Sequence, residues 1–219
     1  MSARRLNLSA IEASLRLVQQ EFTLINEGLS SPREPLTDDV IANMLAGYAL
    51  VDGLVATDVD LFAMGNLKYL LELNATVLCG TNPESRAEYA RHRQTTEDRF
   101  YDERDGGIQD LVEWYELHHQ YSAWMRAAGV YVRLLSRPQL FVEGNHRTGA
   151  LAMSYILIRE QEPPFVLSPA NAPAYFDPAL VIRDTEKQGL AMVFRSPGVI
   201  KRLAGFLVEH ADPAYLLPV

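Results

Sequence analysis

The sequence predicts an all-α fold, and three observations indicate it. Apolar residues recur at the spacing of a helix face along most of the chain. Runs of alternating polar and apolar residues, which are typical of strands, are almost absent. The 219 residues are 48% hydrophobic and 22% charged, which is the composition of a globular protein. We therefore expect a helical bundle with no more than a short β-hairpin added to it.

Composition also excludes several classes of protein. The net charge of −8 disfavours non-specific binding to nucleic acids. The single cysteine, Cys79, cannot form an internal disulfide, and it is most simply a buried apolar residue. No apolar run approaches the ~20 residues that cross a bilayer, and the first residues lack the features of a secretion signal. We therefore expect a cytoplasmic globular protein.

The N-terminal part contains two amphipathic helices. The first has one buried face at 4-3-4-3 spacing, formed by Ile11, Leu15, Val18, Phe22 and Ile25. Gly28 can end this helix, and the Ser- and Pro-rich residues 30–35 indicate a loop. Thr37 can cap a second helix, whose first turn carries two aspartates.

A third helix is expected over about residues 58–78, ending at Gly80. The next residues, 81–107, are rich in charge and poor in aliphatic side chains. Within them, Gln94–Arg99, followed by Phe100, Tyr101 and a Gly106-Gly107 turn, indicates a short β-hairpin or an exposed flap. Long polar connections in compact domains often serve as lids or binding loops. An ordinary solvated loop is the alternative.

Helical spacing returns over residues 108–126, and a shorter helix follows until Pro138 breaks it. Another helix starts near His146 and runs to about Arg159. The Pro-rich residues 163–178 indicate a loop that leads to one or two final helices.

The segment with the clearest chemistry lies between two of these helices. Gly144 and Asn145 tolerate unusual backbone angles, so the chain can turn sharply there and enter a helix. The first N–H groups of a helix lack intrahelical partners and carry positive dipole, which makes such a turn a good phosphate site. Arg147 adds a planar cation, His146 adds partial positive charge, and Glu143 can hold a divalent cation. The alternative is a capped helix start with a surface ion pair.

These residues resemble the Fic/Doc (Fido) family, which is marked by the loop H-x-F-x-[D/E]-G-N-G-R-x-x-R between two helices of an all-α core. Five positions match in order and spacing: Phe141, Glu143, Gly144, Asn145 and Arg147. The Ala-rich stretch before the loop and the Pro-Pro turn after its helix also agree. The resemblance implies a Fic-like bundle over about residues 36–205, preceded by an N-terminal helix, 1–35, and followed by a tail, 206–219.

The resemblance also implies nucleotide chemistry, because members of this family commonly transfer AMP from ATP to a hydroxyl side chain of a target protein. In this chain Glu143 would bind Mg²⁺, and residues 144–147 would hold the phosphates of Mg-ATP or another nucleotide. Phe141 would anchor the loop in the core. Residues 93–105 stand where the family has a flap that aligns the target protein, whose identity is unknown.

Three departures from the family pattern bear on this chemistry. Gln139 stands in place of the motif histidine, the family's general base, and glutamine cannot accept a proton near pH 7. His146 replaces the second motif glycine, and Ala150 replaces the distal arginine. Loss of a general base typically lowers a rate by ~10²–10⁴. We therefore expect AMP transfer to be impaired or altered, unless His146 serves as a replacement base.

A second family feature lies upstream. Thr23, Glu27 and Gly28 fit the pattern [S/T]-x-x-x-E-[G/N] of a helix that inhibits one subclass of the family, where the glutamate contacts the distal motif arginine. Because Ala150 replaces that arginine, Glu27 would need another partner, and Arg147 is the nearest candidate. A plain helix end at Glu27 and Gly28 is the alternative reading.

Other chemistry-bearing residues have simpler explanations. His118 and His119 are adjacent, and neighbours in sequence do not face one site on a helix, so no metal role is expected. Three functional hypotheses remain open: nucleotide binding without efficient transfer, a working transferase with altered chemistry, or an interaction module on a Fic-like fold that binds no nucleotide.

Overall fold

The computed structural model describes residues 4–102, 107–183 and 190–218, and for the described residues between 178 and 196 it describes the backbone alone. The helices in order are α1 (Leu8–Glu27), α2 (Asp38–Ala56), the 3₁₀ helix η1 (Met64–Asn66), α3 (Lys68–Cys79), α4 (Pro83–Glu88), α5 (Ala90–Phe100), α6 (Ile108–Leu117), α7 (Ala123–Leu135), α8 (Asn145–Arg159), α9 (Ala172–Arg183), α10 (Leu190–Glu209) and η3 (Pro213–Tyr215). The described residues form no β-strand beyond one isolated bridge, so the expected all-α class is confirmed.

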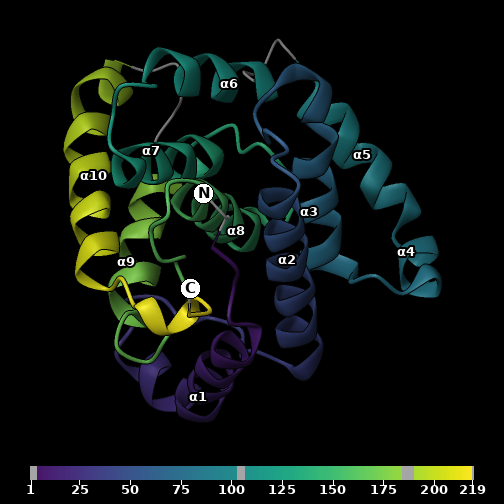
Figure 1. Ribbon diagram of the computed structural model, residues 1–219, viewed down its shortest axis with the longest axis vertical. Helices are drawn as coiled ribbons and strands as arrows, with labels where there is room; N and C mark the ends of the chain where they lie inside the picture. Colours follow the sequence, from purple (N-terminus) through teal and green to yellow (C-terminus); the bar gives the residue numbers. More distant parts are fainter. Residues whose placement is uncertain (1–3, 103–106, 184–189, 219) are drawn as a thin grey trace.

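Helix α8 lies at the centre of the bundle (Figure 1). Every residue from Thr148 to Ile158 is buried, so this helix has no polar face and needs neighbours on all sides. α7 packs along it, α2 and α3 cover other sides, and α10 packs on α7. Among the described helices, α7 and α8 form the most extensive contact, and this packing holds α8 in place.

Helix α1 closes the lower side of the bundle in Figure 1 and packs against α2 and α9. Its expected apolar face is confirmed, since the buried residues include Ile11, Leu15, Val18, Phe22 and Ile25. The expected cap of α2 is confirmed as well, because the Thr37 side chain accepts from the Val40 N–H at 3.3 Å.

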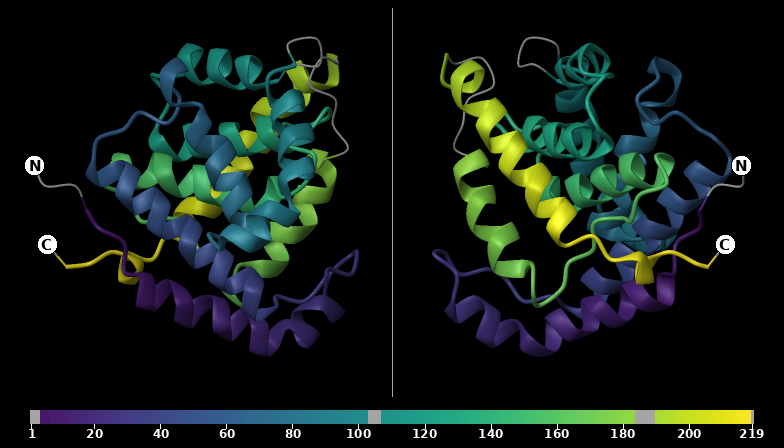
Figure 2. Two further views of the ribbon diagram at one scale, coloured as in Figure 1. Left: turned by 90° about the vertical axis from the view of Figure 1, so that its right-hand side faces the viewer. Right: turned by 60° about the vertical axis from the view of Figure 1, so that its left-hand side comes forward.

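The two ends of the described chain lie close together, at the start of α1 (Figure 2). The N–H of Asn7 donates to the Tyr215 carbonyl at 2.8 Å, and the N–H of Leu217 donates to the Arg5 carbonyl at 2.8 Å. The boundary expected after residue 205 falls inside α10. The C-terminal residues therefore pack with the helices rather than form a separate tail.

The third helix starts later than expected, at Lys68. Turns and η1 occupy the preceding residues, and the hydroxyl of Tyr155 on α8 holds them. That hydroxyl accepts from the Leu61 N–H at 3.0 Å and donates to the Val59 carbonyl at 2.6 Å. A contact with a distant helix thus fixes a turn that local apolar spacing does not reveal.

Two further helix boundaries differ from those expected from the sequence. The helix expected over residues 108–126 is interrupted, because Ser122 caps α7 by accepting from the Met125 N–H at 3.3 Å. The loop expected over residues 163–178 gives way to α9 at Ala172. Pro173 occupies an early helical position, where its missing N–H loses no intrahelical bond.

The hairpin expected over residues 93–105 is wrong for the part that the structure describes. Residues 93–100 belong to α5, and 103–105 lie outside the described residues. α5 buries Thr96 and Phe100, which lie one turn apart on the face toward α3. Because only two residues of α5 are buried, the sequence shows no apolar pattern with the period of a helix in this segment. α4 and α5 lie outside α3, at the edge of the molecule (Figure 1).

One described helix, α2, is long and apolar enough to span a membrane by length and composition. Its buried face includes Ile41, Met44, Tyr48 and Val51, which belong to the core of the bundle. Packing within the protein therefore accounts for its apolar character.

Candidate functional site

The loop before α8 is anchored at Phe141, whose side chain is fully buried and stacks on Phe100 with ring centroids 5.7 Å apart. Asn145 closes the loop from its other end. Its Oδ1 accepts from the Phe141 N–H at 2.9 Å, and its Nδ2 donates to the Phe141 carbonyl at 2.8 Å. Phe141 is therefore enclosed below the loop, and the Asn145 side chain closes the turn above it.

Gly144 makes the turn into α8 with φ of 76°, in the left-handed region that glycine adopts at little cost. A Cβ here would lie 2.9 Å from Asn74 Nδ2 on α3. That nitrogen donates to the Glu143 carbonyl at 2.9 Å and to Thr148 Oγ1 at 3.0 Å, which ties the loop to α3. No side chain caps α8. The loop is therefore rigid, and the positive end of the helix is not covered by a capping side chain.

Arg147 lies in the first turn of α8 and is half-buried. Its Nη1 donates to the Val77 carbonyl on α3 at 2.6 Å, and no carboxylate in the described part of the chain lies within ion-pair distance. Burial lowers the pKa of Arg147, while the charges of Glu143 and Glu34 act in the opposite direction. The guanidinium stays protonated at neutral pH because its ordinary pKa exceeds 12.

His146 is held by two tyrosines of neighbouring helices. Its Nδ1 lies 3.0 Å from the Tyr131 hydroxyl on α7, and the Tyr175 hydroxyl on α9 donates to the His146 carbonyl at 3.1 Å. Burial raises the pKa of both tyrosines well above the ordinary value, so both hydroxyls are neutral at pH 7. The imidazole is therefore oriented by the protein.

Gln139, at the position of the family's histidine, is bonded into the loop. Its Nε2 donates to the Leu135 carbonyl at 3.2 Å, and its Oε1 accepts from Asn145 Nδ2 at 3.3 Å. Arg99 of α5 donates to the Gln139 carbonyl at 2.7 Å. The amide supports the turn, and it has no basic nitrogen with which to take a proton.

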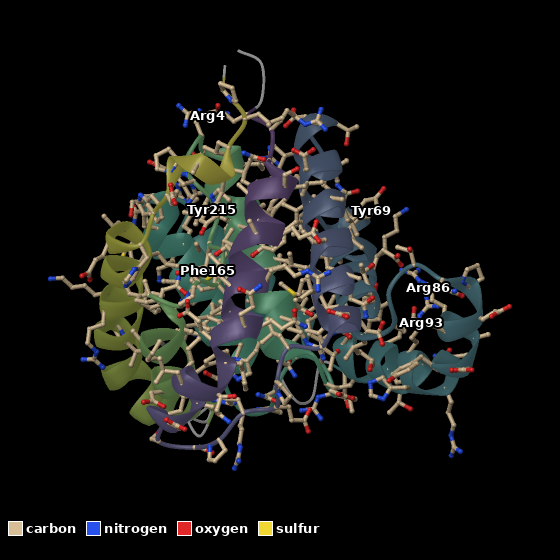
Figure 3. All side chains as sticks on the ribbon, turned by 90° about the horizontal axis from the view of Figure 1, so that it is seen from below. Arg4, Tyr69, Arg86, Arg93, Phe165 and Tyr215 are labelled. Carbon is tan, nitrogen blue, oxygen red and sulfur yellow. The ribbon has the colours of Figure 1, made fainter. Side chains whose placement is uncertain are left out.

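A cavity of about 530 Å³ opens beside the N-terminal end of α8. Its polar lining comes from residues 143–147 and from Arg33 and Glu34, which lie between α1 and α2. Its apolar lining includes Leu15, Met44, Tyr48, Phe165 (labelled in Figure 3), Leu167, Tyr175 and Phe176. The methyl group of Ala150 also lines it. The site thus combines a cationic, dipolar end with aromatic and aliphatic walls.

The residues of the expected inhibitory pattern lie outside this cavity. Thr23, Glu27 and Gly28 are exposed near the end of α1. Glu27 forms no hydrogen bond or ion pair within the described residues, so Arg147 is not its partner in this structure. Gly28 ends the helix, as the simpler alternative holds.

Among the described residues, no three or more His, Cys, Asp or Glu side chains gather in a way that could hold a metal ion. His118 stacks on Trp114 with ring centroids 4.4 Å apart, and His119 is exposed. Sequence reasoning missed Arg33, Glu34 and Tyr131 as members of the site. Arg33 stands between two prolines in a loop, and that pattern alone does not indicate a ligand contact.

Comparison with protein-family models gives no match, and comparison with curated proteins gives none either. Among solved structures, the chain is similar to a protein from Bacteroides thetaiotaomicron that is described as a Fic domain containing signaling protein. The TM-score is 0.51 and the sequence identity 15%, with 92% of each chain covered. The chain therefore has the helical fold of a Fic domain, as the loop residues indicated.

Proposed function

We propose that this Fic-fold protein binds a nucleotide in the cavity beside α8, with a phosphate at the turn formed by Gly144 and Asn145. One observation carries the proposal: a cavity of about 530 Å³ meets a helix N-terminus that no side chain caps. Backbone N–H groups at such an end bind phosphate well, and Arg147 adds a charged donor beside them.

The rest of the cavity fits a ligand that is larger than inorganic phosphate and partly apolar. Tyr175 and Phe176 present aromatic rings, and Leu15 and Met44 present aliphatic surface. Binding sites for small organic ligands commonly measure ~300–1,000 Å³ and combine apolar walls with a few polar groups. A nucleotide fits this division, with its phosphates at the loop and its base against the apolar walls.

The residues present also fit Mg²⁺, which would accompany the nucleotide. Glu143 is exposed at the cavity, and its carboxylate makes no hydrogen bond or ion pair within the described part of the chain. Mg²⁺ usually takes one or two carboxylates, substrate phosphates and several waters, so a single protein carboxylate suffices. When bound, the ion would neutralise phosphate charge, while residues 144–147 would orient the phosphates.

The proposal includes a consequence for catalysis: AMP transfer to a protein hydroxyl is absent or slow. The glutamine side chain of Gln139 is bonded to Leu135 and Asn145, and it cannot act as a general base. His146 is the remaining histidine of the loop, and its Nδ1 is engaged by Tyr131. Nucleotide binding without efficient transfer is the function that these contacts favour.

Calorimetric titration of the wild-type protein with Mg-ATP, Mg-ADP, Mg-GTP and Mg-UTP tests the binding. We expect saturable binding of at least one nucleotide. Arg147→Ala should weaken it by about 10- to 100-fold, the effect of losing a charge-assisted hydrogen bond. Arg159→Ala is the matched control, because this arginine lies at the opposite end of α8 and outside the cavity. A folded wild-type protein that binds none of these nucleotides would contradict the proposal.

Incubation with α-³²P-ATP and lysate proteins tests the expectation for catalysis. We expect little label on any protein with the wild type, and more label with Gln139→His, which restores the motif histidine. Wild-type labelling that survives Gln139→Ala and vanishes with His146→Ala would instead make His146 the base.

The second candidate function is an interaction module that binds no nucleotide. The engaged side chain of Gln139 favours it, as does the helical α5 in place of a flap that could pair with an extended target segment. This alternative predicts that Arg147→Ala leaves binding of a protein partner unchanged, and that no nucleotide competes with the partner.

A further inference from the structure

The α1–α2 strap, residues 28–37, joins the end of α1 to the start of α2 (Figure 2). Its residues 32–36 line one side of the cavity. It carries Arg33 between Pro32 and Pro35, and both prolines restrict the backbone. Asn26, near the end of α1, holds Arg33 on both sides: its Oδ1 accepts from the Arg33 N–H at 2.7 Å, and its Nδ2 donates to the Arg33 carbonyl at 3.2 Å. The backbone of Arg33 is therefore fixed at the cavity wall without help from its side chain.

The Arg33 guanidinium, in contrast, uses little of its donor capacity. Nη2 donates to the Phe176 carbonyl at 3.0 Å, and the group lies 5.5 Å from the centre of the Phe176 ring. Nε is buried without a hydrogen-bond partner, and Nη1 has no acceptor among the described residues. Arginine has five N–H donors, and a buried donor without a partner is unfavourable. Because Nε is enclosed by the protein and Nη2 is bonded to Phe176, Nη1 is the donor left for a further acceptor.

Three other half-buried arginines are each paired with a carboxylate. The pairs are Arg86 with Glu72 at 2.6 Å (Arg86 is labelled in Figure 3), Arg126 with Glu160 at 2.6 Å, and Arg133 with Asp110 at 2.9 Å. Arg33 and Arg147 have no carboxylate within ion-pair distance in the described part of the chain. Both residues line the same cavity, where an anion would meet two positive charges that no carboxylate neutralises directly.

The positive charge of Arg33 acts on the two tyrosines that hold His146. Burial raises the pKa of Tyr131 and Tyr175, and the positive charge of Arg33 acts against that rise at both hydroxyls. The acids of the cavity are Glu34 and Glu143, which are both exposed and both act on Arg147. These two carboxylates balance the two arginines, so a polyphosphate would bind best together with a divalent cation.

We propose that Arg33 is a second anion-binding residue of this cavity and that the ligand carries at least two phosphoryl groups. The inference rests on the proposed nucleotide site. One phosphoryl group accepts from the first N–H groups of α8 and from Arg147, and the other accepts from the Arg33 guanidinium. Ala150, three residues after Arg147, lends only a methyl group to the lining. The second cation therefore has to come from another segment, and the α1–α2 strap supplies it.

The test compares Mg²⁺-containing titrations with adenosine, AMP, ADP and ATP for the wild type and Arg33→Ala. The wild type should bind ADP and ATP more tightly than AMP. Arg33→Ala should lower the affinity for ADP and ATP by about 10- to 100-fold while the affinity for AMP changes little. If Arg33 has only a structural role, Arg33→Ala should instead lower the affinity for all four ligands by the same factor.

Arg16→Ala is the matched control, because Arg16 also links α1 to the start of α2, through Asp38 at 2.5 Å, but lies outside the cavity. It should leave all affinities unchanged. Thermal unfolding checks each variant, and Arg33→Gln, which keeps a long polar side chain without charge, replaces Arg33→Ala if the latter fails to fold. If Arg33→Ala leaves the affinities for AMP and ATP unchanged, or lowers both by the same factor, the role of Arg33 is overturned. The proposed nucleotide site still stands in that case if Arg147→Ala lowers the affinity. A wild type that binds no nucleotide overturns both.

Discussion

The two ends of helix α8 differ in how far their polar groups are engaged by the protein. At the C-terminal end, the Arg159 guanidinium donates to the Tyr155 hydroxyl at 2.7 Å, to the Val59 carbonyl at 3.3 Å and to Asp58 at 3.2 Å. Cations at a helix C-terminus are favoured by the macrodipole, so these contacts stabilise the fold. The donors at this end are largely used by the protein itself.

The N-terminal end of the same helix is left partly unused. Gly144 turns the chain into α8 without a capping side chain, and Arg147 makes a single hydrogen bond, to Val77. A cavity lies beside these groups. At the C-terminal end of α8 the arginine is engaged by the protein, whereas at the N-terminal end the proposed ligand would supply acceptors for the helix and Arg147.

The largest expected effect concerns the anchor of the N-terminal end. Phe141→Ala removes a fully buried ring that stacks on Phe100 and should lower the free energy of unfolding by about 3–5 kcal/mol. Chemical unfolding measures it. Val142→Ala, at the exposed neighbour, is the control and should change stability little. Intact nucleotide binding by a folded Phe141→Ala protein would show that the loop does not depend on this anchor.

The next effect concerns the turn. Gly144→Ala places a Cβ at a positive φ and 2.9 Å from Asn74, so it should lower stability by about 1–2 kcal/mol or more and weaken nucleotide binding. Gly205→Ala is the control in α10, where a Cβ meets nothing within 4 Å, and it should raise stability by up to about 1 kcal/mol. Thermal unfolding distinguishes the two. Equal behaviour of both variants would mean that the turn at Gly144 is not strained by a side chain.

Two arginine variants test directly whether the two ends of α8 differ in function. Arg159→Ala should lower the free energy of unfolding by about 1 kcal/mol through lost hydrogen bonds, with nucleotide affinity unchanged. Arg147→Ala should mainly reduce the stabilisation of the protein by added Mg-nucleotide, measured as the rise in unfolding temperature. If Arg159→Ala reduced that ligand-induced rise as much, the two ends would not be functionally distinct.

The smallest effect appears at alkaline pH. Burial raises the pKa of Tyr131 well above 10.0, and raises that of Tyr155 less strongly, where a hydrogen bond from Arg159 opposes the rise. A raised pKa in the folded state stabilises the fold below the unfolded pKa and loses that contribution as pH rises. Stability should therefore fall above about pH 10, because the unfolded tyrosines ionise there. Tyr131→Phe should make this fall shallower, and Tyr155→Phe should do so less. Denaturant unfolding across this pH range measures both.

Local signals predicted much of the fold. The buried face of α1, the Thr37 cap and the turn at Gly144 each depend on residues within one or two helical turns, so the sequence shows them directly. The break at Ser122 was missed because apolar spacing continues across it. The interruption before α3 was missed because Tyr155, far along the chain, holds it.

The candidate site was predictable only where it is continuous in sequence. Residues 143–147 follow one another, so their backbone geometry and charge could be inferred together. Arg33 lines the cavity from the segment between α1 and α2, and Tyr131 contacts His146 from α7, and no spacing rule connects either residue to the loop. The hairpin over residues 93–105 was expected from the family resemblance, whereas residues 93–100 belong to α5. Only Thr96 and Phe100 of this helix are buried, so the sequence shows no helical period there.

The pairing of residues 5–7 with residues 215–217 has a practical consequence for engineering. A chain whose ends are already joined by backbone hydrogen bonds can be closed there with a short linker and reopened in an exposed loop, because circular permutation needs such proximity. The strap that carries Arg33 begins at the far end of α1, whose 20 residues extend about 30 Å. Fluorophores or immobilisation tags attached at the paired ends would therefore leave that wall of the cavity accessible to ligand.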